Sequence, residues 1–162
     1  MDCCDVGSVA TPEAVIKDCP SCGERGRLVK PITLISLLPG GPPAPAERYR
    51  FCGTVGCDVA WFSQDTGHVV STSQVPLRIG QKESAPDRAL CYCFGYTAAD
   101  MTTDVARTGT SGIPDVITEH CRRGEDRCPE TNPQGACCLG NVRAALEDAL
   151  ANNLETLSCA CG

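Results

Sequence analysis

The sequence is poor in the large apolar side chains that normally build a protein core. Leu, Ile, Val and Phe together make up about a fifth of the 162 residues, and aromatic residues are only 4%. A chain with so little apolar material buries a small core and commonly adds disulfides or metal ions. The composition therefore excludes a conventional single-core enzyme domain that is stabilised by packing alone.

Other features that would assign the chain to a known class are also absent. No apolar run approaches the roughly 20 residues that a membrane-spanning helix needs, so we expect no membrane insertion. The net charge is −6 and the sequence has no block of basic residues, which argues against nucleic-acid binding. No glycine-rich phosphate loop, nucleophile elbow or paired-carboxylate arrangement occurs, so we predict no catalytic residue.

Cysteine, in contrast, is abundant, with 14 residues. The chain opens on Met1-Asp2-Cys3-Cys4-Asp5, which lacks the basic start and apolar run of a secretory signal. We therefore expect a cytoplasmic protein, in which thiols stay reduced and patterned cysteines more often hold metal ions than disulfides.

The two halves of the chain differ in pattern. The segments 28–38, 48–51, 59–62 and 75–79 predict strands, whereas 39–45 is too rich in proline and glycine for a helix or a ladder. The polar, proline-interrupted segment 80–87 is expected to separate two small domains, residues 1–86 and residues 87–162.

The second half predicts three helices. Thr97 and Asp100 form a capping-box pattern before the first helix, which Gly109 ends. Pro114 suits the first turn of the second helix, and Gly124 ends it. Apolar residues recur at helical spacing from 142 to 157, which predicts a third helix packed on its own domain. The fold class expected is α+β, with a small zinc-ribbon-like β subdomain followed by a helical subdomain.

The first half carries two cysteine pairs at metal-ligand spacing. Cys19 and Cys22 form a CxxC followed by glycine, which permits the tight turn of a metal-binding knuckle. Cys52 and Cys57 supply a second pair between two expected strands. Zinc is the expected ion because it accepts four thiolates in a closed tetrahedral site. A redox-active CxxC, and an acid or His68 in place of one thiolate, stay open as alternatives.

The second half offers thiols that suit a different centre. Cys91 and Cys93 form a CxC at a strand end just before a helix, and Cys137 and Cys138 stand where the long helix is expected to begin. Backbone N–H groups and the positive end of the helix dipole stabilise anionic sulfur at such positions. The pattern predicts an anionic iron–sulfur cluster whose reduction potential is tuned by N–H···S bonds.

Four motifs in this order resemble a known family: CPSCG at 19–23, YRFCGTVGCDVAWF at 49–62, CYCFGYT at 91–97 and NPQGACCLGNV at 132–142. The chain is similar to the amino-terminal iron–sulfur domain of CopZ-type copper chaperones, which resembles in turn the bacterioferritin-associated ferredoxin-like module. The resemblance implies zinc in the first half, a [2Fe–2S] cluster in the second, and copper handling that includes reduction of Cu2+ to Cu+.

The resemblance also implies the cluster ligands Cys91, Cys93, Cys128 and Cys138. The related module has a thiol three residues before its last ligand, where this sequence has Gly135. CopZ-like members use a displaced cysteine, which implies Cys128 for the remaining position. Cys121 and Cys137 stay open as substitutes.

Four cysteines near the ends remain, namely Cys3, Cys4, Cys159 and Cys161. CopZ-type chaperones continue into a second domain with a Cu+-binding CxxC, for which we find no room in these 162 residues. Soft thiolates prefer Cu+ and Hg2+, so we expect Cys159 and Cys161 to capture such an ion. Incidental cysteines on a flexible tail are the alternative.

The leading hypothesis is a cytosolic metalloprotein of copper or mercury resistance or trafficking, whose one-electron redox activity reduces the metal ion before capture or transfer. A metal-transporting ATPase or a redox protein would be its partner. The alternatives are a non-redox metallochaperone or scavenger with a structural or sensing cluster, and a ferredoxin-like donor of electrons or clusters. Metal-ion reductase activity is compatible with the sequence, but electron transfer and metal binding are favoured over an enzyme.

Overall fold

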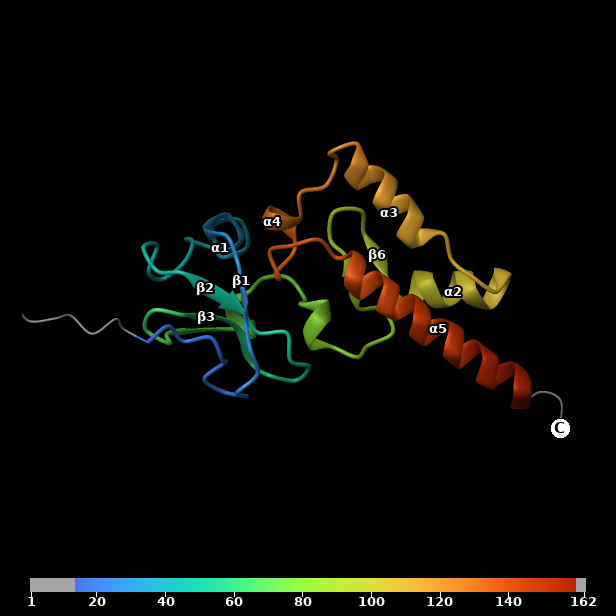
Figure 1. The fold of residues 1–162 in the computed structure, drawn as a ribbon, viewed down its shortest axis with the longest axis horizontal. Helices are drawn as coiled ribbons and strands as arrows, with labels where there is room; N and C mark the ends of the chain where they lie inside the picture. The colour runs from blue at the N-terminus through green and yellow to red at the C-terminus, as the bar shows by residue number, and fades with distance from the viewer. Residues whose placement is uncertain (1–13, 160–162) are drawn as a thin grey trace, which may run out of the picture.

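The computed structural model describes residues 14–159, which form a small sheet region followed by a helical region (Figure 1). The elements in chain order are β1 (Arg27–Leu28), α1 (Pro31–Leu37), β2 (Tyr49–Phe51), β3 (Val59–Ser63), β4 (Val69–Ser71), the 3₁₀ turns η1 (Thr72–Gln74) and η2 (Gly80–Lys82), β5 (Ala89–Cys91), β6 (Tyr96–Thr97), α2 (Ala98–Thr108), α3 (Ile113–Arg122), α4 (Cys128–Thr131) and α5 (Leu139–Cys159). The expected α+β class, with the sheet first, is confirmed. None of the helices in the described part of the chain is long and apolar enough to cross a membrane.

The sheet is antiparallel with the order β1-β2-β3-β4, and it confirms the strands expected near 48–51 and 59–62. Strand β3 is buried along its whole length because apolar clusters cover both of its faces. Trp61 packs into the larger cluster together with Leu34 and Val70. Phe62 packs on the other face against Cys19 and Cys52. Cys19 and Cys52 are therefore packed directly against β3, an inner strand of the sheet.

The prediction of strands across 28–38 was wrong, because only Leu28 belongs to a strand and α1 follows it. Pro31 begins the helix, since its fixed φ suits the first turn and its missing N–H is not needed there. Leu34 and Leu38, four residues apart, are buried, whereas Ile35 is 55% exposed. The burial of Leu34 and Leu38 on one face stabilises the helix, although the β-branched residues of this segment favour a strand.

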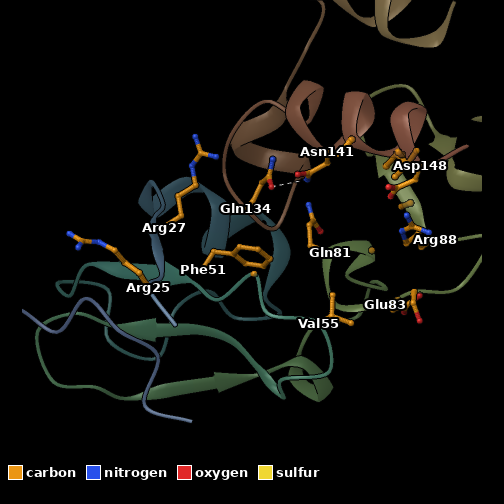
Figure 2. A pocket seen from close by; sticks show the side chains of 17 residues that line it. Arg25, Arg27, Phe51, Val55, Gln81, Glu83, Arg88, Gln134, Asn141 and Asp148 are labelled. Atoms are coloured by element: carbon orange, nitrogen blue, oxygen red, sulfur yellow. Dashed lines mark hydrogen bonds between the residues drawn. The ribbon is translucent and has the colours of Figure 1, made fainter. Parts of the chain in front are cut away.

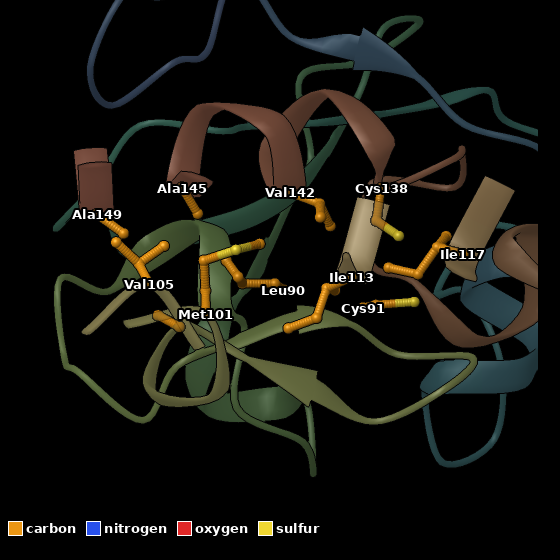
Figure 3. Close-up of a cluster of buried hydrophobic side chains, with 11 residues drawn as sticks. Leu90, Cys91, Met101, Val105, Ile113, Ile117, Cys138, Val142, Ala145 and Ala149 are labelled. Carbon is orange, nitrogen blue, oxygen red and sulfur yellow. The ribbon is translucent and has the colours of Figure 1, made fainter. Parts of the chain in front are cut away.

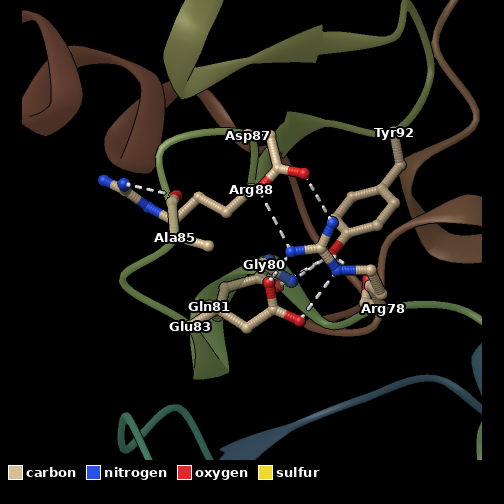
Figure 4. Close-up of polar contacts among 8 residues, drawn as sticks. All are labelled: Arg78, Gly80, Gln81, Glu83, Ala85, Asp87, Arg88 and Tyr92. Carbon is tan, nitrogen blue, oxygen red and sulfur yellow. Dashed lines mark hydrogen bonds and ion pairs between the residues drawn. The ribbon is translucent and has the colours of Figure 1, made fainter.

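The strand expected at 75–79 was also wrong, because this segment only connects η1 and η2. Pro76 has no N–H to give to a ladder. The connection is held instead by ion pairs from Arg78 to Glu83 and Asp87 (Figure 4). The Tyr92 hydroxyl accepts a bond from the Gly80 N–H at 2.7 Å.

The three helices expected in the second half are confirmed. Thr97 caps α2, and Gly109 ends it in the left-handed region with φ +80°. The buried side chains of these elements form one core that α5 crosses (Figure 3). Val142 and Ala149 of the predicted apolar stripe are buried in this core, whereas Leu154 is 68% exposed. Of the apolar residues predicted at helical spacing from 142 to 157, those near the start of α5 therefore pack against the core, and Leu154 does not.

The sheet region and the helical region are joined by hydrogen bonds between distant parts of the chain. Trp61 Nε1 donates to the Pro133 carbonyl at 2.8 Å, and Thr33 Oγ1 donates to the Pro129 carbonyl at 2.7 Å. Helix α4 lies against α1 (Figure 1). These contacts fix the loop that leads into α5. A division of the chain at residues 86 and 87 stays a prediction.

Candidate metal centres

The thiols of Cys19, Cys22, Cys52 and Cys57 meet in one group, with all four Sγ atoms within 4.8 Å of one another. The Sγ–Sγ distance is 4.0 Å from Cys19 to Cys57 and 3.6 Å from Cys22 to Cys52. A tetrahedral ion with Zn–S bonds of about 2.3 Å places its sulfur ligands about 3.8 Å apart. The four thiols therefore fit a zinc ion, and His68 is not part of the group.

Local backbone geometry positions each of the two pairs. The Gly23 N–H donates to the Cys19 carbonyl at 2.9 Å, and Gly23 has φ +74°, so the knuckle turns tightly below its thiols. The second pair lies on the β2–β3 connection, where the Cys52 N–H donates to the Ala60 carbonyl at 3.0 Å. Cys19 and Cys52 are buried, whereas Cys22 is exposed. No helix begins after Cys22, which disfavours the thioredoxin-like alternative.

The two thiols of the CxxC pair, Cys19 and Cys22, have different pKa values. The Thr54 hydroxyl, 3.3 Å from the Cys22 sulfur, lowers the pKa of Cys22 to about 6. Burial raises the pKa of Cys19 to about 12. One thiol therefore ionises readily, while the other needs a nearby cation before it loses its proton. A coordinated metal ion supplies that cation, since a metal-bound thiol is deprotonated outright.

A comparison with protein families covers this part of the chain. Residues 16–76 match the zinc-binding domain of CopZ proteins. The matched range contains all four thiols of the group, so a four-cysteine Zn2+ site is part of this CopZ-like domain. The chain is also similar to the X-ray structure of the N-terminal domain of CopZ from Archaeoglobus fulgidus, at 25% identity and a TM-score of 0.63. That match covers 78% of this chain and 95% of the other.

The resemblance to CopZ read from the sequence motifs is confirmed by these two matches. A comparison with curated proteins gave no match. The cysteines of the second half lie beyond the CopZ-like zinc-binding domain, and their role rests on their own geometry.

Before α5, the helical region contains six cysteines, namely Cys91, Cys93, Cys121, Cys128, Cys137 and Cys138. The Sγ atoms of Cys93 and Cys128 are 3.6 Å apart. Cys91 and Cys138 are buried in the same core, and their sulfur atoms lie at one end of it (Figure 3). Cys121 is half-buried at the edge of this core, and Cys137 is exposed. In the described part of the chain, these thiols do not form a compact group like the zinc site.

Hydrogen-bond donors lie beside the Cys93 sulfur. The Arg127 backbone N–H donates to the Cys93 sulfur at 3.3 Å, and the Thr131 hydroxyl lies 3.2 Å from the same atom. The hydrogen bond from Cys138 lowers the pKa of Cys91 to about 6, whereas the same contact raises the pKa of Cys138. Cys91 and Cys138 together thus hold a single negative charge more easily than two.

Two amide side chains that the sequence analysis missed fix the loop before α5. Asn132 and Gln134 are buried, and Gln134 Nε2 donates to the Cys137 carbonyl at 2.9 Å. Asn132 Nδ2 donates to the Ala136 carbonyl at 2.8 Å. Gln81, distant in sequence, donates to Asn132 Oδ1 at 3.0 Å. The Asn-Pro-Gln-Gly run was a signal for a turn, but it did not indicate these interior contacts.

The structure describes one of the four cysteines near the chain ends, two of which, Cys159 and Cys161, are the predicted capture residues. Cys3, Cys4 and Cys161 lie outside the described residues, and Cys159 is the last residue of α5.

A separate groove of about 530 Å³ runs between the sheet region and α5 (Figure 2). Its lining includes Arg27, Phe51, Gln81 and Asp148 but no cysteine. Gln134 and Asn141 contact each other at its edge, with a 3.0 Å bond from Asn141 Nδ2 to Gln134 Oε1. The groove is therefore distinct from both groups of thiols.

Proposed function

We propose that this chain is a cytoplasmic [2Fe–2S] and zinc metalloprotein that handles a soft metal, copper or mercury, and reduces the metal ion by one electron before capture or transfer. The observation that carries the proposal is the arrangement of thiols in pairs. A four-cysteine [2Fe–2S] cluster contains two irons and four thiolates, so each iron takes one thiolate pair. Cys93 and Cys128, with sulfur atoms 3.6 Å apart, offer one such pair, and Cys91 and Cys138, buried in one core with their sulfur atoms at the same end, offer the other.

These four thiols are the ones that we infer to hold the cluster. The Arg127 N–H and the N-terminal end of α5 place positive dipole ends near the sulfur atoms. Such donors favour the more negative, reduced state and raise the reduction potential. When bound there, a reduced [2Fe–2S] cluster can donate one electron. The reduction of Cu2+ to Cu+ requires one electron.

The zinc site has a different task in this proposal. Four thiolates saturate the coordination of the ion and leave no open position for chemistry. The site also ties the CxxC knuckle to the β2–β3 connection in a region with a small apolar core. We infer that zinc stabilises the sheet region and takes no part in electron transfer.

The thiols at the chain ends are the capture site in this proposal. Cys159 and Cys161 form a CxC, and soft thiolates select Cu+ and Hg2+ over harder ions. Cys3 and Cys4 supply further thiols of the same kind. A metal-transporting ATPase or a redox protein would receive the ion or supply the electron. Replacing Cys159 and Cys161 by serine should weaken Hg2+ binding, and unchanged affinity would contradict capture at this end.

Cysteine-to-serine variants test the ligand set. Cys128→Ser should abolish the visible absorption of the anaerobically purified protein and leave its zinc content unchanged. Cys137→Ser is the matched control and should keep the absorption. Retention of the cluster in Cys128→Ser together with its loss in Cys137→Ser would contradict the assignment.

Copper reduction tests the redox part separately. The dithionite-reduced protein, freed of excess reductant, should convert Cu2+ to Cu+, which a Cu+-specific chromogenic chelator detects. Cys128→Ser should lose this activity. A cluster that accepts no electron reversibly would contradict the redox role and favour a non-redox metal-binding protein.

A further inference from the structure

Lys82 is a buried charged side chain that the proposed function does not use. It is the last residue of η2 and is only 8% exposed. In the described part of the chain no ion pair includes Lys82, and the neighbouring Glu83 pairs with Arg78 instead. A lysine is rarely buried without a negative partner, because its charge loses hydration on burial. The surroundings of the Lys82 ammonium therefore have to supply negative charge.

The Lys82 ammonium lies beside the zinc site. Its Nζ donates to the Thr54 carbonyl at 3.3 Å and is 5.7 Å from the centre of the Phe51 ring. Phe51 and Thr54 stand on either side of Cys52 in the chain. The Thr54 hydroxyl lies 3.3 Å from the sulfur of Cys22, so one residue contacts both the ammonium and a thiol of the zinc site.

We propose that Lys82 is the cationic partner of this zinc site. Zn2+ with four thiolates carries about two net negative charges by valence counting, and a cation held nearby offsets part of them. Residues outside the ligand sphere commonly strengthen a metal site through such charges and hydrogen bonds. The inference rests on the zinc site of the proposed function and is independent of the inferred cluster and of copper handling.

Lys82 also holds the loop that carries the second cysteine pair of the zinc site. The Gly56 N–H donates to the Lys82 carbonyl at 3.1 Å. The Thr54 carbonyl, which accepts from the Lys82 ammonium, also accepts from the Cys57 N–H at 3.3 Å. The loop between Cys52 and Cys57 is thus fastened to Lys82 at two points, once by its side chain and once by its backbone.

The position of Lys82 is fixed by contacts of η2 with the helical region. The Gly80 N–H donates to the Tyr92 hydroxyl at 2.7 Å (Figure 4). Gln81 Nε2 donates to Asn132 Oδ1 at 3.0 Å. Because these partners lie outside the zinc site, the charge of Lys82 is preorganised beside the thiols.

Zinc competition in the anaerobically purified full chain tests the role of this charge. Lys82→Met keeps an unbranched apolar stem but removes the ammonium, and it should weaken zinc binding about 10–100-fold against a competing chelator. Lys17→Met is the matched control, since it removes the same charge from an exposed lysine two residues before Cys19. It should leave zinc binding unchanged. Unchanged zinc binding in Lys82→Met would overturn the inference.

A second readout separates the charge of Lys82 from its packing. Iodoacetate is anionic and iodoacetamide is neutral, and peptide mass spectrometry compares their rates of reaction with the exposed Cys22 thiol. Loss of the ammonium should slow iodoacetate relative to iodoacetamide, whereas a loop that is only loosened changes both rates alike. The same rate ratio in Lys82→Met and in the wild type would contradict the role of the charge.

Amine labelling of the wild type needs no variant. With zinc bound, Lys82 should react with acetic anhydride more slowly than the exposed Lys17, and removal of zinc should raise its reactivity relative to Lys17. An unchanged ratio after zinc removal would contradict the link between Lys82 and the zinc site. The proposed function fails differently, through a wild type that holds no zinc or no cluster.

Discussion

Gly135 is a residue at which the sheet region and the helical region approach very closely. It has φ +65°, and a Cβ there would lie 2.9 Å from Thr33 Oγ1 and 3.0 Å from Val29 Cγ1. Gly135→Ala therefore has to push α1 away from the loop before α5, in addition to the cost of the left-handed backbone. We expect it to lower the free energy of unfolding by about 1–3 kcal/mol more than a glycine replacement in open space.

Gly109→Ala is the matched control, because Gly109 has φ +80° and a Cβ added there would meet no atom within 4 Å. It carries only the left-handed backbone cost of about 1–2 kcal/mol. Urea unfolding of both variants at equal metal content measures the difference. Equal losses would show that the contact between Gly135 and α1 does not limit packing.

At the scale of single elements, the cap of α2 makes a separate contribution. The Asp100 carboxylate accepts bonds from the Thr97 hydroxyl at 2.7 Å and from the Thr97 N–H at 2.8 Å. The Thr97 hydroxyl holds the pKa of Asp100 below its usual range. Thr97→Ala should therefore lower the free energy of unfolding by about 1 kcal/mol at neutral pH.

The same shift gives the pH dependence of this cap. Because the folded pKa of Asp100 lies below the unfolded one, its contribution is present above the unfolded pKa and is lost as pH falls through the folded value. The effect of Thr97→Ala should shrink accordingly at acidic pH in thermal unfolding. Thr103→Ala, at an exposed position of the same helix, is the control. A pH-independent effect of Thr97→Ala would contradict the role of Asp100.

Elements with local signals could be predicted from the sequence, and elements that depend on distant partners could not. The cap at Thr97 and the glycine end at Gly109 are local, and α2 was predicted with them. Helix α1 carries strand-like composition and depends on α4, which lies about a hundred residues later in the chain. The contact of Gln81 with Asn132 is likewise set by the fold rather than by local sequence.

At the scale of the whole molecule, a hydrogen bond joins the strand beside the zinc site to the loop before α5, so we expect the zinc site to influence the thiols of the helical region. Trp61 lies on β3 between the zinc ligands and the loop before α5, and it bonds to Pro133. Removing zinc with a strong chelator should loosen β3, change the fluorescence of this single tryptophan and weaken the visible absorption of the inferred cluster. Added zinc should restore both signals. Unchanged visible absorption after complete zinc removal would contradict the coupling.

The metal centres were predictable from the sequence to different degrees. The spacing of two cysteine pairs was enough to predict a four-thiolate zinc site, because each pair is local. The helical region has six thiols for four inferred cluster positions, and spacing alone cannot pair residues from β5, α3, α4 and two loops. The short distance between the Cys93 and Cys128 sulfurs, and the burial of Cys91 and Cys138 in one core, emerge only once these elements are packed together.

The central claim is that one chain holds a zinc ion and a [2Fe–2S] cluster at separate thiol sites. Metal and acid-labile sulfide analysis of the anaerobically purified protein tests it most directly. The account predicts about one zinc, two irons and two sulfides per chain. Zinc without iron, or iron without acid-labile sulfide, would contradict it.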